Sequence, residues 1–189
     1  MKKFRSTLAL LAVVTGFTTV SAQSMQSEKT VEVGGAPMYP SKNIIQNAVN
    51  SKDHTTLVTA VKAAGLAETL QGPGPFTVFA PTDAAFAKLP AGTVESLVKP
   101  ENKTMLTGIL TYHVVPGRVD SKELAAWIKK GNGKAELTTV AGGKLWAMME
   151  GKNIVIKDEK GNKSLVSIKD VYQSNGVIHV IDSVLMPRQ

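Results

Sequence analysis

The stretch Gly74–Pro90, with the sequence GPFTVFAPTDAAFAKLP, constrains the fold of this chain more than any other. Within it, Phe76–Ala80 combines aromatic and β-branched residues after a Pro-Gly-Pro turn, which predicts a short buried strand. Pro81 ends that strand because proline has no N–H to donate to a neighbouring strand. Thr82 and Asp83 can then cap a short helix in which Phe86 and Leu89 share an apolar face. A strand, a sharp corner and a one-sided helix therefore follow one another directly.

The apolar residues recur with different periods in the earlier and the later parts of the chain. Helical spacing dominates up to residue 130, and beyond Ala135 the period changes to two, with turn formers such as Asn175-Gly176 between the apolar runs. Helices that precede a run of short strands predict an α+β fold, here an antiparallel sandwich covered by helices. We expect the helices to bury Met105 and Trp127, and Ser121 to cap the helix that begins at Lys122. Predicted helices span residues 43–50, 57–64, 66–70, 93–98, 101–112 and 122–130, and later strands span 113–115, 136–140, 144–149, 153–157, 165–168, 177–181 and 184–185.

The first 22 residues are typical of a cleaved secretory signal. Lysine and arginine precede the apolar run Leu8–Val20, and Val20-Ser21-Ala22 offers the small residues that a signal peptidase recognises. The run is shorter than the ~20 residues of a membrane span, although an uncleaved anchor is the alternative. We predict a signal peptide at residues 1–22, a flexible tail at residues 23–42 and one domain at residues 43–189. The protein would then be secreted, to the periplasm or the extracellular space.

Composition excludes several classes of function. The chain has no cysteine, which rules out disulfides, thiol catalysis and cysteine-based metal sites. The formal charge of +7 falls to +4 when Lys2, Lys3 and Arg5 leave with the signal, and aromatic residues make up only 5%. Four lysines lie within residues 152–163, but Asp158 and Glu159 interrupt them, which indicates a solvated face rather than a nucleic-acid patch.

The three histidines, at positions 54, 113 and 179, are the residues most suited to catalysis or metal binding. None of them lies in a pair with the spacing of metal ligands, and the chain has no GxSxG, HExxH or P-loop motif. His113 falls at a helix-to-strand junction and His179 inside an apolar strand, where structural roles are expected. The sequence therefore predicts no enzyme activity, no metal and no cofactor. The alternative is a small-ligand carrier or an enzyme that uses His113 or His179 in a pocket.

Three segments together resemble the fasciclin domain family. They are TVFAPTDAAFAKLP at Thr77–Pro90, LTYHVVPGRV at Leu110–Val119 and NGVIHVIDSVLMP at Asn175–Pro187. Their order and separation are similar to those of the family's signature blocks, and the resemblance covers about Ile44–Pro187. It implies a wedge-shaped β-sandwich with helices packed along one edge, which agrees with the period pattern.

The resemblance also implies a function in extracellular adhesion, without catalysis. The expected partner is a cell-surface or matrix protein or polysaccharide, with no nucleic acid, no membrane insertion after signal cleavage, and a monomeric domain. Tyr112-His113 matches a Tyr-His pair linked in animal members to integrin binding, with a packed junction as the alternative interpretation. Lys169-Asp170-Val171 falls where some animal members carry an adhesive Asp-Ile motif, with valine here in place of isoleucine.

Overall fold

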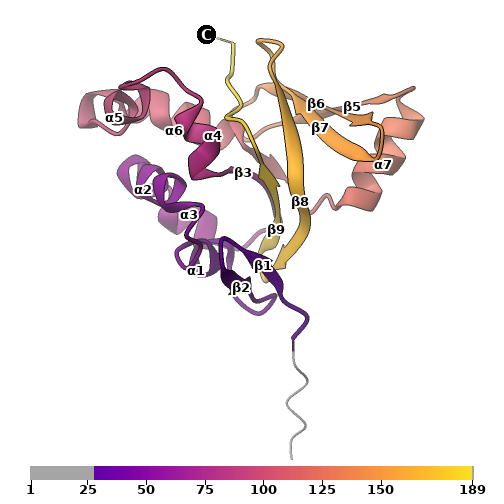
Figure 1. Cartoon of the computed structure of the whole chain (residues 1–189), viewed down its shortest axis with the longest axis horizontal. Coiled ribbons are helices and arrows are strands. Elements are labelled where there is room, and N and C mark those ends of the chain that lie inside the picture. Colours follow the sequence, from indigo (N-terminus) through magenta and orange to yellow (C-terminus); the bar gives the residue numbers. More distant parts are fainter. Residues whose placement is uncertain (1–27, 189) are drawn as a thin grey trace, which may run out of the picture.

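The computed structural model describes residues 28–188, in which helices flank one large sheet on two sides (Figure 1). This architecture confirms the predicted α+β fold class, and the predicted signal peptide lies outside the described residues. The helices are α1 (Ile44–Ala48), α2 (Thr55–Ala64), α3 (Ala67–Gln71), α4 (Asp83–Ala87), α5 (Thr93–Leu97), η1 (Pro100–Asn102, a 3-10 turn), α6 (Lys103–Tyr112) and α7 (Ser121–Lys130). The strands are β1 (Val31–Val33), β2 (Ala36–Met38), β3 (Phe76–Pro81), β4 (Val114–Pro116), β5 (Lys134–Thr138), β6 (Lys144–Glu150), β7 (Asn153–Lys157), β8 (Lys163–Gln173) and β9 (Gly176–Ile181). Within residues 28–188, no helix is long and apolar enough to cross a bilayer.

Seven strands form the large sheet, in the order β4-β3-β9-β8-β7-β6-β5. Neighbouring strands are antiparallel except β3 and β9, which run parallel with Phe79 beside His179. This parallel pair places the strand of the Gly74–Pro90 stretch next to the last strand of the chain. The pairing of β8 with β9 shifts register twice between Val166 and Val171, and such irregularities increase the local bend of a strand.

The sheet separates two hydrophobic cores. The inner core, between β3 and β9 on one side and β5, β6, β7 and α7 on the other, includes Phe79, Tyr112, Leu124, Leu137, Leu145, Ile156, Ile181 and Leu185. The helix-side core, between β3 and β9 and the helices α1, α2, α3 and α6, includes Ile44, Leu57, Val61, Val78, Leu110, Ile178 and Val180. In Figure 1 these four helices lie on one side of β3 and β9, and α7 lies beside β5–β7. Because successive side chains of a strand point to opposite faces, β3 contributes Phe79 to one core and Val78 to the other.

The Gly74–Pro90 stretch connects these layers as its sequence predicts. The hydroxyl of Thr82 accepts a hydrogen bond from the N–H of Ala85 at 3.2 Å and so caps α4. The carboxylate of Asp83 caps a different helix, since it accepts from the N–H groups of Thr55 at 3.2 Å and Thr56 at 2.8 Å at the start of α2. The turn after β3 therefore caps the N-termini of two helices, α4 and α2.

The prediction of a flexible tail is wrong for residues 31–38. These residues form the hairpin β1–β2, and Val33, Ala36 and Met38 are buried in the helix-side core. The adjoining residue Tyr39 exchanges hydrogen bonds with the side-chain amide of Asn47 in α1, at 3.0 and 2.8 Å, and that amide also donates to Gln173 in β8. Strands of three residues are too short to show a period, so their burial depends on tertiary contacts.

Other differences are smaller. Met105 and Trp127 are 48% and 43% exposed, where the helical spacing predicted burial. The N-cap of α7 is Asp120, whose carboxylate accepts from the N–H groups of Lys122 and Glu123, both at 2.9 Å. Residues 184–185, predicted as a last strand, are buried but make no strand pairing.

Candidate functional site

Tyr112, one of the candidate binding residues, is completely buried at the end of α6. Its hydroxyl donates to the carbonyl of Lys144 at 2.7 Å and accepts from the N–H of Glu159 at 3.1 Å. Burial raises the pKa of this phenol to about 12. Gly143 lies directly against the ring, where an added Cβ would come within 2.6 Å of Cε2. These contacts join α6 to the β5–β6 turn and to the loop after β7.

His113, the second member of the pair, is only 3% exposed and uses both ring nitrogens inside the domain. Nδ1 donates to the carbonyl of Ile109 at 2.8 Å, and Nε2 accepts from the N–H of Leu185 at 3.0 Å. Burial lowers the pKa of the imidazole to about 4, so the ring is neutral at physiological pH. The pair has the contacts of a packed junction, and neither side chain reaches the surface.

The three residues Lys169-Asp170-Val171 do not point the same way. Val171 is buried, and Lys169 is exposed. Asp170 has a left-handed backbone, with φ of 59°, and its carboxylate accepts from the N–H and the hydroxyl of Ser121 at the start of α7. Lys169 and Asp170 border a surface groove of about 330 Å³ between β8 and the β1–β2 hairpin, which Tyr172 also lines. Among the three residues, Lys169 is therefore the one available to a partner.

The remaining histidines differ in how well their nitrogens are satisfied. In His179, Nε2 donates to the carbonyl of Val119 at 2.9 Å and Nδ1 accepts from the N–H of Asp170 at 3.4 Å. In His54, Nδ1 shares a hydrogen bond of 2.9 Å with the hydroxyl of Ser51. His54 Nε2 is the one buried side-chain nitrogen or oxygen in residues 28–188 that has no hydrogen-bond partner.

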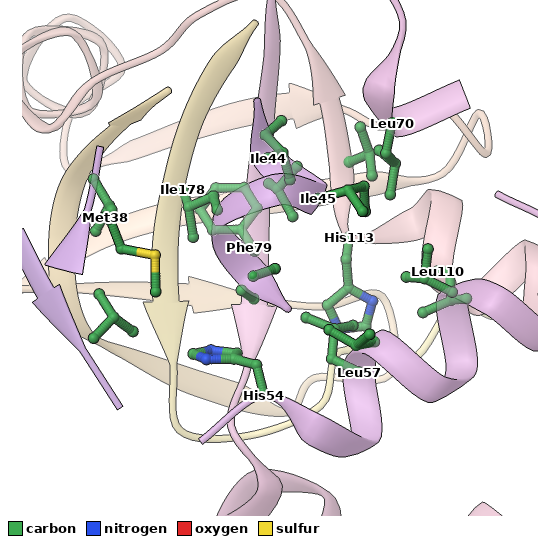
Figure 2. Close-up of a pocket in the computed structure, with 18 residues that line it drawn as sticks. Met38, Ile44, Ile45, His54, Leu57, Leu70, Phe79, Leu110, His113 and Ile178 are labelled. Carbon is green, nitrogen blue, oxygen red and sulfur yellow. The ribbon is translucent and has the colours of Figure 1, made fainter. Parts of the chain in front are cut away.

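The side chain of His54 lines a cavity of about 50 Å³ in the helix-side core (Figure 2). The β1–β2 hairpin, α1, α2 and β3 enclose the cavity, and apolar side chains such as Met38, Ile44 and Leu57 form its walls. Burial lowers the pKa of the His54 imidazole. The backbone of Ala80 opposes this shift, although it makes no hydrogen bond of normal geometry with Nε2. A neutral imidazole thus faces an apolar space, which suits a small uncharged ligand better than an ion.

Proton-transfer or nucleophilic chemistry finds little support in this arrangement. Ser51 and His54 have the contact of a nucleophile and its base, but Ser51 is itself only 3% exposed. No carboxylate among the described residues hydrogen-bonds to the ring of His54 to orient it. Within the same residues, no three side chains of histidine, aspartate or glutamate gather as metal ligands would.

Sequence reasoning did not single out His54 as a cavity residue. It begins a helix, and the apolar walls around it come from the hairpin, α1 and β3, which are distant in sequence. The only available signal was that the chain has three histidines. An unpaired nitrogen is a property of the packed structure, so a motif search could not have found it.

Comparison with known proteins gives consistent results. The fasciclin domain model matches residues 52–187. Protein sll1483 of Synechocystis is 46% identical over 182 residues, which covers 95% of this chain and 93% of that protein. Immunogenic protein MPB70 of Mycobacterium bovis is 36% identical over 145 residues, covering 74% of this chain and 66% of that protein.

A solved structure supports the fold. It contains a FAS1 domain pair from the insect cell adhesion molecule Fasciclin I, with a TM-score of 0.69 and 20% identity over 85% of this chain and 58% of the other. The family match begins after β1, β2 and α1, so part of the cavity wall lies outside it. The match over residues 52–187, together with a relative 46% identical over nearly the whole length, shows that this chain belongs to the fasciclin domain family.

Proposed function

We propose that this protein is a non-enzymatic, secreted binding module that attaches cells to a surface or to a matrix. The observation that carries the proposal is the fasciclin family match over residues 52–187. The structural relative named above is a cell adhesion molecule, and the first 22 residues of this chain have the features of a secretory signal.

The position of the titratable groups supports binding over catalysis. His113 and His179 have both ring nitrogens occupied by backbone groups, so neither can exchange a proton with a substrate without breaking the fold. The larger hollows lie on the surface. One of these is the groove between β8 and the hairpin, which combines the cation of Lys169 with the exposed ring of Tyr172. Aromatic side chains such as that of Tyr172 are enriched where proteins bind partners.

The test is attachment of a deletion strain, compared with its parent and with strains complemented by variants. We expect deletion to reduce attachment or aggregation on at least one surface, and the wild-type gene to restore it. Complementation with Lys169→Glu tests the groove, with Lys99→Glu as the control, because Lys99 is an exposed lysine between α5 and η1, outside the groove. Unchanged attachment of the deletion strain across several surfaces would overturn the proposal.

A second candidate function is a small-ligand carrier that uses the cavity of His54. The unpaired Nε2 and the apolar walls favour it, since one hydrogen-bonding group in an apolar pocket is typical of ligand sites. The volume of about 50 Å³ admits only a few atoms, so a longer ligand would require the β1–β2 hairpin to move. Native mass spectrometry of the protein purified from its own host distinguishes the two functions. A stoichiometric bound mass that His54→Leu removes supports the carrier, and an unliganded protein excludes it.

A further inference from the structure

The outer face of the strands β5, β6 and β7 carries an aromatic side chain among lysines. Strand register places the outward-facing residues in two rows across the sheet. The opposite face of the same strands contributes Leu145 and Ile156 to the inner core. Apart from Val155, which is buried, the residues of these rows are partly or fully exposed. The first row is Glu136, Trp146 and Lys157, and the second is Lys134, Met148 and Val155.

The ring of Trp146 is held in place rather than free to rotate. Its indole Nε1–H donates to the carboxylate of Glu136 at 3.3 Å, and the ammonium of Lys134 lies 5.3 Å from the ring centroid. Trp146 and Met148 border a shallow groove of about 300 Å³, which continues to Lys160. An indole fixed in a groove is a flat apolar platform whose binding costs little side-chain entropy.

The lysines around this platform have no carboxylate partner among the described residues, although the ammonium of Lys134 lies over the indole ring, whereas the carboxylates are already engaged. Lys134, Lys157 and Lys160 make no ion pair within residues 28–188. Asp158, in contrast, is 1% exposed, and it accepts hydrogen bonds from the N–H groups of Asn162 at 2.8 Å and Met186 at 3.0 Å.

The other two acidic side chains near Trp146 are also engaged. Glu159 accepts from the N–H groups of Lys144 at 2.9 Å and Arg188 at 3.0 Å. Glu136 pairs with the ammonium of Lys144 at 2.6 Å in addition to its contact with Trp146. The acidic residues that interrupt the lysines in the sequence are thus tied to the backbone, which leaves the lysines as the groups that a ligand would meet.

We propose that this groove binds an acidic polysaccharide, with the C–H face of a uronic acid ring stacked on Trp146 and its carboxylate paired with Lys157 or Lys160. The polarised C–H groups of a sugar ring can lie over the face of an indole in the same way as a cation does. The unpaired lysines select an anionic chain over a neutral one. The proposal rests on the proposed function, since it names the partner class of the adhesive module.

Tryptophan fluorescence offers a direct test, because the chain has two tryptophans. In a Trp127→Phe background, Trp146 is the only tryptophan, so its emission can be excited selectively over that of the three tyrosines. Short alginate oligosaccharides serve as the polyuronate probe. We expect a saturable change in Trp146 emission with alginate and none with dextran, a neutral polysaccharide. Affinity should fall as salt is raised, since exposed ion pairs contribute to it.

Variants locate the site. By isothermal titration calorimetry, Trp146→Ala should lose affinity for alginate by roughly thirtyfold or more, as expected for a central tryptophan of an interface. The double change Lys157→Glu, Lys160→Glu should reduce both the affinity and its salt dependence. Trp127→Ala and Lys99→Glu are the matched controls, an exposed tryptophan on α7 and an exposed lysine outside the groove, and both should bind as the wild type does. Thermal melting of each variant separates lost binding from lost folding.

Three results would overturn the proposal. They are the absence of any saturable signal with alginate, equally tight binding of dextran, or equally tight binding of a DNA oligonucleotide, which would indicate unselective attraction to polyanions. The outcome is separable from that of the proposed function. If Trp146→Ala abolishes alginate binding but deletion leaves attachment unchanged, the groove is real and adhesion is wrong. If deletion abolishes attachment and Trp146→Ala restores it fully, adhesion stands and this groove is not its site.

Discussion

The two hydrophobic cores of this domain differ in how completely their side chains are packed and hydrogen-bonded. In the inner core, Phe79, Tyr112, Leu145 and Ile181 are completely buried, and the hydroxyl of Tyr112 both donates and accepts a hydrogen bond. In the helix-side core, the β1–β2 hairpin, α1 and α2 leave a cavity of about 50 Å³, and His54 presents an unpaired nitrogen to it. The unpaired nitrogen and this cavity, which Phe79 also borders, both lie on the helix side of the sheet.

The difference follows from what encloses each core. The inner core lies between parts of one continuous hydrogen-bonded sheet, whose walls are fixed relative to one another. The helix-side core is enclosed by short helices and by a two-stranded hairpin that pairs only with itself. Short separate elements pack less completely than a sheet and can shift more easily, because fewer backbone bonds hold them. We therefore expect mutations in the inner core to cost more.

The largest expected effect is that of Phe79→Ala in the inner core. Removing a completely buried phenylalanine should lower the free energy of unfolding by about 3–5 kcal/mol, measured by urea denaturation. Phe86→Ala is the matched change on α4, and it should cost less because Phe86 is 8% exposed and borders a surface groove. If Phe86→Ala proves as costly as Phe79→Ala, the two cores are equally rigid and the contrast between them fails.

The second-largest effect is expected at acidic pH, where protonation of the buried histidines lowers the free energy of unfolding. Burial holds the pKa of His113 at about 4 in the folded state, below the ordinary 6.5 that applies once the chain unfolds. The unfolded state therefore binds a proton first, so the stabilisation is fully present above about pH 6.5 and is lost as pH falls towards 4. For His113 the loss is about 3 kcal/mol. Burial lowers the pKa of His54 and His179 as well, which adds to the loss in the same direction.

The measurement is the free energy of unfolding in urea at a series of pH values, for the wild type and for His113→Gln. The variant should be less stable at neutral pH and should depend less on pH between 6.5 and 4. An identical pH slope in both proteins would show that His113 is not the group that titrates.

A smaller effect is expected from Tyr112→Phe, which removes only an oxygen. The carbonyl of Lys144 and the N–H of Glu159 lose their partner, at a cost of about 1–3 kcal/mol in a buried site. Tyr172→Phe is the control, since Tyr172 is 39% exposed and its hydroxyl bonds to Asp120 at the surface, so its stability should change by no more than about 0.5 kcal/mol. A Tyr112→Phe protein as stable as this control would mean that the junction does not depend on its hydroxyl.

The smallest change should come from His54→Leu in the helix-side core. Leucine removes the unpaired Nε2 but also deprives the Ser51 hydroxyl of its partner, so stability should stay within about 1 kcal/mol of the wild type. The same replacement at His113 leaves two backbone groups without partners and should cost about 1–3 kcal/mol for each. A large loss in His54→Leu would falsify the view that this imidazole has no essential contact.

Most of the candidate site could not be predicted from the sequence, although its residues were named there. Tyr112-His113 and Lys169-Asp170-Val171 were selected by position within family-like segments, which says nothing about the direction of a side chain. Whether Tyr112 faces solvent depends on the β5–β6 turn and on the loop after β7, both of which are distant in sequence. Asp170 is likewise directed by the start of α7, where Ser121 donates to its carboxylate.

The sequence by itself determined the local elements and the family. The Pro-Gly-Pro turn and Pro81 predict the two ends of β3, and Thr82 caps α4 as expected. The period of two predicts β5, β6, β7 and β9. All of these features depend on neighbouring residues. Only the tertiary structure decided that the 31–38 segment is a buried hairpin, that β3 lies parallel to β9, and that Met105 and Trp127 remain exposed. It also left His54 unpaired and freed the lysines around Trp146 from the acidic residues beside them in the chain. Each of these outcomes is set by which distant surface an element packs against, and local propensity carries no information about that choice.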